Sequence, residues 1–409
     1  MKKNWQSGGA AFDMDREKFN FSIIRLSRTK GFTDILFHRS LARYHTIEGI
    51  VRNFDNIGGK NIKLCNEEKI YEEIDDCNKL GARIITYLDR EYPPYLKSTG
   101  TFPLTLTCLG NMDLLNNGRK LAIVGSRSCS VNSFNFARKI SREVSSYGYV
   151  VVSGLARGID SGSHVGSLEN GTIAVLGSGM DNIYPKENEY LFYEILDKNG
   201  LIISEFPLHT KPRPENFPIR NRIIAGISKG VLIISAGMMS GSLHTANQAI
   251  KYGREVLVFP GNPYDNNYIG SNMLLQQGAT MVTGVTDIIE NLESVVIPED
   301  TIFQDGIQEF NGKSDYGDRD GSDLVQNYGG EGYTSVIEEE VQTILEDDSQ
   351  KLTPEELVLS KLDYCPIDIG ELIDQSNLDI NEINSIIMKL NLEGKIIVEN
   401  GKICTRSSY

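Results

Sequence analysis

The chain has 409 residues, of which 40% are hydrophobic and 23% are charged, and its formal net charge is −14. These values are ordinary for a globular protein of two or three domains. No stretch approaches the roughly 18 consecutive apolar residues of a membrane span, and the N-terminus lacks the apolar core of a secretory signal. The six cysteines and five histidines are scattered and form no metal-ligand motif. We therefore expect a reduced, cytoplasmic protein that makes no membrane contact and needs neither a metal nor a cofactor.

The negative charge is concentrated in residues 293–352, which contain 16 acidic and 3 basic residues. By contrast, residues 120–292 contain 15 basic and 14 acidic residues. The acidity of the whole chain therefore says little about what the central region binds. We predict that the acidic segment is a mostly disordered linker between two folded parts.

Residues 1–80 are predicted to form a small helical region, with short helices over 20–80. The next segment, 81–110, predicts a strand, a proline-rich turn and a second strand. These two strands lead into the main domain, which we place at residues 81–292.

Within the main domain, short apolar runs that end in small residues alternate with helical patterns. The predicted strands are 120–127, 148–154, 172–179, 200–206, 230–237, 255–261 and 279–284. The predicted helices are 131–147, 187–198, 219–228, 241–252, 270–277 and 286–292. This alternation predicts an α/β fold, namely a Rossmann-like, doubly wound parallel sheet with helices on both faces.

The last part of the chain, residues 353–409, predicts three helices closed by the hairpin "KIIVENGKICTR". Helices at 354–362, 367–375 and 380–393 followed by a hairpin are typical of a small winged-helix domain. The third helix carries acidic as well as basic residues, whereas a helix that reads DNA should be basic. We therefore expect this domain to contact protein and not duplex DNA.

Ligands of doubly wound sheets bind beyond the carboxyl ends of the strands. These ends carry "GSRSCS" (125–130) and "SGLARGIDSGSH" (153–164), and "SGS" (240–242) begins a helix. Backbone N–H groups in such motifs can hold an oxyanion, and an arginine between glycines can fork onto a phosphate. The alternative is a set of tight turns and helix caps. The candidate residues are Gly125, Ser126, Arg127, Arg157, Gly158, Ser240, Gly241 and Ser242. We interpret Asp160 and His164 as structural.

The segment "KPRPENFPIRNRIIAG" (211–226) contains four cations, at 211, 213, 220 and 222, against the single acid Glu215. Asn216 and Pro218 are helix start signals, which places Arg220 and Arg222 in or beside the first turn, where the helix dipole disfavours positive charge. Phe217 lies among these cations, and an aromatic ring between basic residues is typical of single-stranded nucleic acid sites. We therefore predict that phosphates offset the charges. The alternative is a solvated loop anchored by a buried phenylalanine.

These motifs, in this order along the chain, resemble the DNA-processing protein A family (DprA/Smf). The resemblance covers 81–292 and, to a lesser degree, 353–404, and "FPIRNRIIAGIS" (217–228) is its most specific block. A weaker similarity over 20–80 points to a helical domain of sterile-alpha-motif type. At Ser235, after the fifth strand, the chain departs from the glutamate usual in the family.

The resemblance implies a Rossmann-like protein that binds single-stranded DNA, forms homodimers and loads a RecA-type recombinase in natural transformation and homologous recombination. It places the DNA pocket at Gly125, Ser126, Arg127, Arg157, Gly158, Phe217, Arg220, Asn221 and Arg222. From the motifs themselves we add Lys211, Asn216 and the serine motif at 240–242.

Two other functions remain open. The rim of the sheet could hold a single nucleotide, as in phosphoribohydrolases of related fold, but the stretch at 240–249 has no acid that could serve catalysis. The C-terminal domain could instead make the chain a protein-interaction adaptor. Because no catalytic constellation is present, we expect the protein not to be an enzyme.

Overall fold

The structure, a computed structural model, falls into two compact units, Met1–Gln304 and Asp305–Tyr409. In the first unit it describes residues 9–58, 62–238 and 240–294. In the second it describes residues 354–355, 358, 367–369, 372, 379–393, 395–399 and 402–405.

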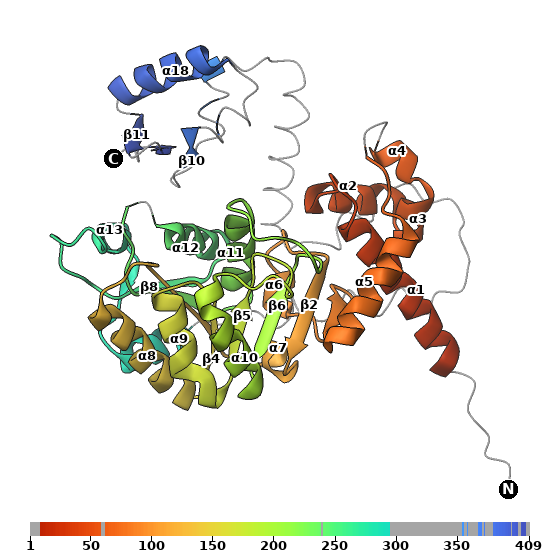
Figure 1. Cartoon of the computed structure of the whole chain (residues 1–409), viewed down its shortest axis with the longest axis horizontal. Coiled ribbons are helices and arrows are strands. Elements are labelled where there is room, and N and C mark those ends of the chain that lie inside the picture. The colour runs from red at the N-terminus through yellow and green to blue at the C-terminus, as the bar shows by residue number, and fades with distance from the viewer. Residues whose placement is uncertain are drawn as a thin grey trace, which may run out of the picture. The chain divides into compact units, whose positions relative to one another are not determined.

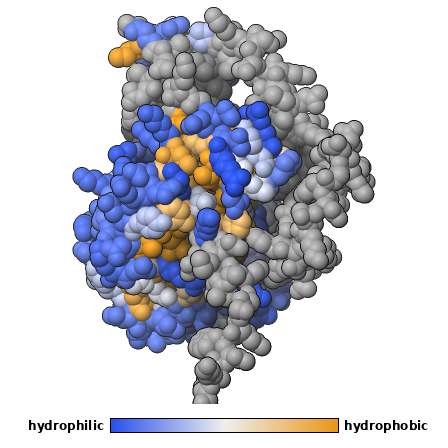
Figure 2. All heavy atoms as spheres, turned by 90° about the vertical axis from the view of Figure 1, so that its right-hand side faces the viewer, coloured by the Kyte–Doolittle hydropathy of each residue, from blue (hydrophilic) through white to orange (hydrophobic). Residues whose placement is uncertain are grey.

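The first unit begins with the short helices that the sequence predicts. They are α1 (Gly9–Ser27), α2 (Asp34–Tyr44), α3 (Ile47–Arg52), α4 (Phe54–Gly58) and α5 (Glu67–Leu80). Thr33 and Thr46 cap α2 and α3, since each hydroxyl accepts a hydrogen bond from a backbone N–H group in the first turn. These helices lie together at one end of the sheet (Figure 1). From their side, the molecule shows apolar residues gathered within a mostly hydrophilic surface (Figure 2).

The core of this unit is a nine-stranded sheet of order β1-β2-β6-β5-β4-β3-β7-β8-β9. Its strands are β1 (Arg83–Thr86), β2 (Thr105–Gly110), β3 (Lys120–Val124), β4 (Val150–Ser153), β5 (Thr172–Val175), β6 (Leu201–Ser204), β7 (Gly230–Ile233), β8 (Glu255–Val258) and β9 (Thr280–Met281). The pairs β1–β2 and β2–β6 are antiparallel, and all other neighbours are parallel. The α/β prediction is confirmed. The strand order reverses between β3 and β7, which makes their carboxyl ends the expected ligand site.

Helices cover both faces of the sheet (Figure 1). One face packs against α8 (Val131–Ser146), α9 (Ile159–Ser167), α10 (Glu189–Asp197) and α14 (Val285–Ser294). The other packs against α6 (Pro94–Lys97), α11 (Asn216–Gly226), α12 (Gly241–Lys251) and α13 (Ile269–Gln276). The short elements α7 (Asp113–Asn116), η1 (Leu168–Asn170) and η2 (Lys186–Asn188) complete the unit. No helix in the described residues is long and apolar enough to cross a membrane.

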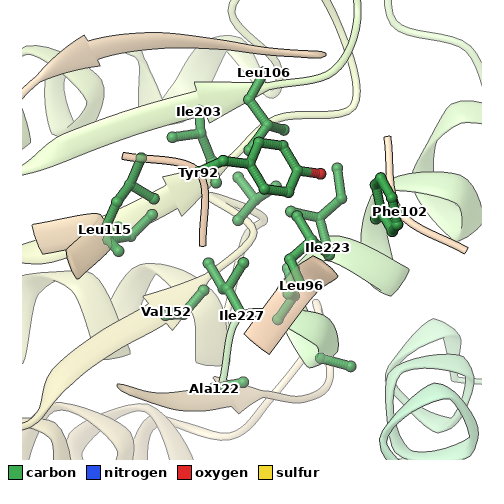
Figure 3. Packing of buried hydrophobic residues seen from close by; sticks show 14 of the residues in the cluster. Tyr92, Leu96, Phe102, Leu106, Leu115, Ala122, Val152, Ile203, Ile223 and Ile227 are labelled. Atoms are coloured by element: carbon green, nitrogen blue, oxygen red, sulfur yellow. The ribbon is translucent and has the colours of Figure 1, made fainter. Parts of the chain in front are cut away.

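A continuous apolar core joins the second face of the sheet to α11 and to the segment between β1 and β2 (Figure 3). Ile223 and Ile227 of α11 are fully buried against strand residues such as Val152 and Ile203. Leu96 of α6 packs in the same cluster. Burial of apolar area at roughly 25 cal/mol per Å² stabilises this arrangement, so α11 is held firmly on the sheet.

The helix α9 is not among the helices predicted from the sequence, which include none between residues 147 and 187. Its sequence, "IDSGSHVGS", is rich in glycine and serine, which are poor helix formers. The small residues serve packing instead. A Cβ atom on Gly166 would lie 2.2 Å from the carbonyl oxygen of Arg138 in α8. Tertiary contact therefore overrides local propensity here.

The second unit contains α18 (Ile380–Leu392) and a three-stranded sheet of order β10-β12-β11. Its strands are β10 (Ile367–Asp368), β11 (Ile396–Glu399) and β12 (Lys402–Thr405). The third predicted helix and the closing hairpin are thus present. Most residues of the first two predicted helices, and the predicted linker 293–352 apart from its first two residues, lie outside the described residues. The winged-helix domain therefore stays a prediction.

Replacement of Gly166 tests the contact between α8 and α9. We expect Gly166→Ala to lower the free energy of unfolding by about 2–3 kcal/mol, because the added methyl group meets backbone that cannot move away cheaply. Gly118→Ala is the matched control, since nothing lies within 4 Å of a Cβ at that position. Urea denaturation measures both variants. Equal stability of the two would contradict the close packing.

Candidate nucleic-acid interface

The loop after β3, residues 125–130, is tied to its neighbours by backbone hydrogen bonds. The N–H of Ser126 donates to the carbonyl of Ser235 at 2.8 Å, and the N–H of Ile159 donates to the carbonyl of Ser126 at 3.2 Å. Ser130 caps α8 by accepting from the N–H of Ser133. The predicted alternative of turns and caps therefore describes part of this motif correctly. Arg127, by contrast, is exposed.

Gly158 brings the loop after β4 against the loop after β3. It adopts φ 77°, a left-handed conformation that favours glycine, and it begins α9. A Cβ atom there would lie 2.3 Å from the carbonyl oxygen of Ser126. The structure therefore places Gly125, Ser126, Arg127 and Gly158 together at the carboxyl edge of β3 and β4.

Phe217 in the first turn of α11 reaches the same edge. The guanidinium carbon of Arg127 lies 5.2 Å from the centre of the Phe217 ring, and that of Arg220 lies 6.0 Å from it. These distances fall within the usual range of cation–π contacts. The ring of Tyr184, from the loop after β5, lies 5.6 Å away. An aromatic ring and an exposed arginine, far apart in sequence, thus meet at this edge.

Three further cations of the 153–164 and 211–226 segments face solvent. Arg157 lies 3.6 Å from Glu187, and Arg213 lies 3.7 Å from Glu215, in pairs whose members are all more than half exposed. Such pairs contribute little to stability. Lys211 is exposed and has no ion pair within the described part of the chain. These side chains remain available to an anion.

The helix α11 begins at Asn216, three residues before the predicted start, so Arg220 and Arg222 lie in its second turn. Arg220 thus lies directly beside the first turn, as predicted, whereas Arg222 lies two residues further along, where the helix dipole has less effect. Arg220 is only 3% exposed, and its Nη1 donates to the carbonyl oxygens of Gly154, at 2.6 Å, and Val175. Burial lowers the pKa of Arg220 to about 10, which still leaves it charged at neutral pH.

Arg222 is also engaged by protein groups. Its guanidinium pairs with Asp34 of α2 at 2.8 Å and with Glu205, just after β6, at 2.5 Å. It donates to the carbonyl of Thr101 as well. Burial raises the pKa of Glu205, and Arg222 opposes that rise. Carboxylates from two other segments therefore offset the charge of Arg222, so this arginine does not need a ligand's phosphate.

The remaining predicted residues lie around the start of α11 and α12. Asn216 is buried, and its side-chain nitrogen has no hydrogen-bond partner among the described residues. Asn221 donates to the carbonyl of Gly241 at 3.2 Å, which joins the two helices. Ser240 caps α12 through the N–H of Ser242. The serine motif therefore acts as a cap in this structure.

Asp160 and His164 are both buried, as their structural interpretation requires. Asp160 accepts from the N–H of Gly154 at 3.1 Å, and burial raises its pKa. His164 accepts from the N–H of Leu155 at 3.3 Å and contacts the hydroxyl of Thr172 at 2.9 Å. Burial lowers the pKa of His164 to about 3. Through these hydrogen bonds both side chains hold the loop after β4 in place.

Sequence reasoning missed three residues of this region. Asp34 and Glu205 partner Arg222, but nothing in their local sequence points to it. Tyr184 lies directly after the glycine-rich end of β5, and an aromatic residue at that place in a ligand-binding edge is a usable signal. Ser235, after β7, is buried, and its hydroxyl has no partner among the described residues.

Comparison with known proteins decides the family. Residues 83–293 match the family model of DNA recombination-mediator protein A. The chain belongs to the DprA/Smf family. It is 41% identical to DNA processing protein DprA of Bacillus subtilis over 214 residues, which cover 52% of this chain and 72% of that protein. It is 42% identical to Protein Smf of Escherichia coli over 204 residues, which cover 49% of this chain and 54% of that protein.

A solved structure supports the same assignment. The crystal structure of DprA from Streptococcus pneumoniae aligns with a TM-score of 0.55 at 33% sequence identity. The alignment covers 66% of this chain and 95% of that one. The region shared by the DprA/Smf family therefore includes the whole carboxyl edge described above.

The ion pairs of Arg222 can be tested by substitution. We expect Arg222→Met to lower the free energy of unfolding by about 3–5 kcal/mol, because it leaves Glu205 buried without its partner. The double variant Arg222→Met/Glu205→Met should regain part of this loss. Arg213→Met, which removes an exposed arginine, is the control. A loss no larger than that of the control in urea denaturation would contradict the network.

The buried state of His164 predicts a pH dependence. Between its folded pKa of about 3 and the ordinary value of 6.5, the unfolded chain binds more protons at this residue than the folded chain. Stability should therefore fall as pH drops below 6.5, with a slope contribution of up to about 1.4 kcal/mol per pH unit. Denaturation of His164→Gln across this range should show a shallower slope. An unchanged slope would contradict the buried neutral imidazole.

Proposed function

We propose that this DprA/Smf protein binds single-stranded DNA along the carboxyl edge of its sheet, protects the strand and loads a RecA-type recombinase onto it. The observation that carries this proposal is the contact between exposed Arg127 and the ring of Phe217, at 5.2 Å. A cation for the phosphate and an aromatic face for the base are the two elements of sequence-tolerant single-strand binding.

The surrounding geometry supports the assignment. Gly125 and Gly158 let the loops after β3 and β4 pack closely, since a Cβ atom would lie 2.6 Å from Ile159 at the first position and 2.3 Å from the carbonyl oxygen of Ser126 at the second. Arg157, after β4, and Lys211, after β6, are further exposed cations of this region. The charge of Arg220 and Arg222 suggests that they bind phosphate. They instead hold α11 in place, because their side chains are mostly buried.

The remaining candidates have lesser parts in the proposal. Asn221 and the motif at 240–242 set the spacing of α11 and α12 at the edge of the site. Membership of a family of recombination mediators supports the delivery of the strand to a recombinase and the assembly of the protein into homodimers. We place this activity in natural transformation and homologous recombination.

The alternative of a nucleotide-cleaving enzyme has no support at the corresponding position. The start of α12, where an acid would be needed, reads "SGSLHTANQA" and places Ser240 and Ser242 in a helix cap. Incubation with nucleoside monophosphates should therefore release no free base. Release of free base would favour the nucleotide-cleaving enzyme over the DNA-binding protein.

Binding to a fluorescent oligo-dT strand tests the proposal. The protein should prefer this strand to duplex DNA, and its affinity should fall linearly with the logarithm of salt concentration. Arg127→Ala should weaken binding and reduce the salt slope by about 1, because one phosphate contact is lost. Anisotropy titrations at several salt concentrations measure both quantities.

Lys139→Ala supplies the control, since Lys139 is an exposed lysine in the middle of α8 that pairs with Glu143 at 3.7 Å. Its affinity and salt slope should equal those of the unsubstituted protein. If Arg127→Ala behaves like Lys139→Ala, the site is misplaced. If the unsubstituted protein shows no affinity for oligo-dT, the proposed function is wrong.

A further inference from the structure

Part of the Phe217 ring is covered by the protein itself. Its edge packs against the backbone of the loop after β5, where a Cβ atom on Gly177 would lie 2.9 Å from the ring. The guanidinium groups of Arg127 and Arg220 both lie near the ring, at 5.2 Å and 6.0 Å from its centre. Phe217 is accordingly only partly exposed, and it offers limited area to a base.

Tyr184 stands beside Phe217 and has free ring surface. It is 40% exposed, and its ring centre lies 5.6 Å from that of Phe217 at an interplanar angle of 42°. Bases stacked within one strand of a duplex follow each other at about 3.4 Å. Bases resting on these two rings would be further apart and tilted, so the arrangement suits a strand whose bases are splayed.

The loop that carries Tyr184 is held in place by hydrogen bonds. The hydroxyl of Ser178 donates to the carbonyl of Asn182 at 2.8 Å, and the N–H of Gly179 donates to the carbonyl of Thr210 at 2.9 Å. Beyond the loop, buried Asn188 donates to the carbonyl of Leu155 at 2.8 Å. A ring on a fixed loop loses little conformational entropy when a base stacks on it.

We propose that Tyr184 is a second base-stacking position, so that the site engages two consecutive bases of a single strand, one at Phe217 and one at Tyr184. This inference rests on the proposed function. Charge supports the position, since Arg127 lies at the neighbouring ring. Lys186, two residues beyond Tyr184, is 72% exposed and pairs with Glu189 at 3.7 Å. The role needs an aromatic ring and does not need the hydroxyl group.

Two other exposed tyrosines provide a contrast. Tyr190 and Tyr193 of α10 are 63% and 53% exposed. They lie on a helix that carries Glu189 and Glu194, whose charge disfavours a phosphate backbone. Tyr190 is therefore a matched control for a tyrosine that is exposed but does not stack on a base.

Affinity for oligo-dT measured at several salt concentrations tests the role of the ring. Tyr184→Ala should weaken binding by roughly 5- to 150-fold, the usual range for the loss of one stacked base. The salt slope should stay unchanged, because the ring carries no charge. Tyr184→Phe and Tyr190→Ala should bind like the unsubstituted protein. If the unsubstituted protein binds oligo-dT and Tyr184→Ala binds it equally well, the inference is overturned while the proposed function stands.

A second measurement locates the bases, and its first part uses only the unsubstituted protein. Abasic sites are placed one at a time along the strand, and binding to the unsubstituted protein is measured. Two adjacent positions should each lose affinity, and in Tyr184→Ala only one of them should remain sensitive. A single sensitive position in the unsubstituted protein would contradict the second stacking site. A strand that does not bind at any position would instead refute the proposed function.

Discussion

The guanidinium group of Arg220 holds the carboxyl edge of the sheet together. It donates to the carbonyl of Gly154, just after β4, and to that of Val175, at the end of β5, and so joins the ends of these two strands to α11. Phe217 lies three residues earlier on the same face of α11. Anchoring Arg220 therefore also fixes the ring that contacts Arg127.

The arginines of this region divide into two groups with different tasks. Arg220 and Arg222 are buried or nearly so, and backbone carbonyls or carboxylates neutralise them. Arg127 and Arg157 are exposed, and their partners are the ring of Phe217 and the exposed carboxylate of Glu187. The first group stabilises the fold around the site. Only the second group can exchange bound water for a phosphate at a low cost in free energy. A basic sequence motif alone does not distinguish these tasks.

Much of the fold follows from local sequence. The alternating apolar runs predict the strand and helix order of residues 120–292, because buried parallel strands and amphipathic helices have distinct periods. The helix α9 escapes this reasoning, since its glycines and serines serve contact with α8 and not helix propensity. The start of α11 is misjudged by three residues, and with it the position of two arginines along the helix.

The candidate site is predictable only where its parts are local. Glycine and arginine residues mark the loops after β3 and β4 as candidate ligand-binding loops in the sequence. That these two loops lie side by side follows from the topology of a doubly wound sheet. The partners of Arg222 cannot be predicted from the local sequence. Asp34 lies 188 residues away along the chain and is brought close only by the docking of the N-terminal helices. The Tyr184–Phe217 contact is likewise a product of tertiary structure.

A crystal structure of the protein with a short deoxythymidine strand tests the central claim most directly. The account predicts the strand along the ends of β3, β4 and β5, with a phosphate at Arg127, bases at Phe217 and Tyr184, and the hydrogen bonds of Arg220 and Arg222 intact. A strand bound elsewhere, or an Arg222 released from Asp34 and Glu205 to hold a phosphate, would contradict it.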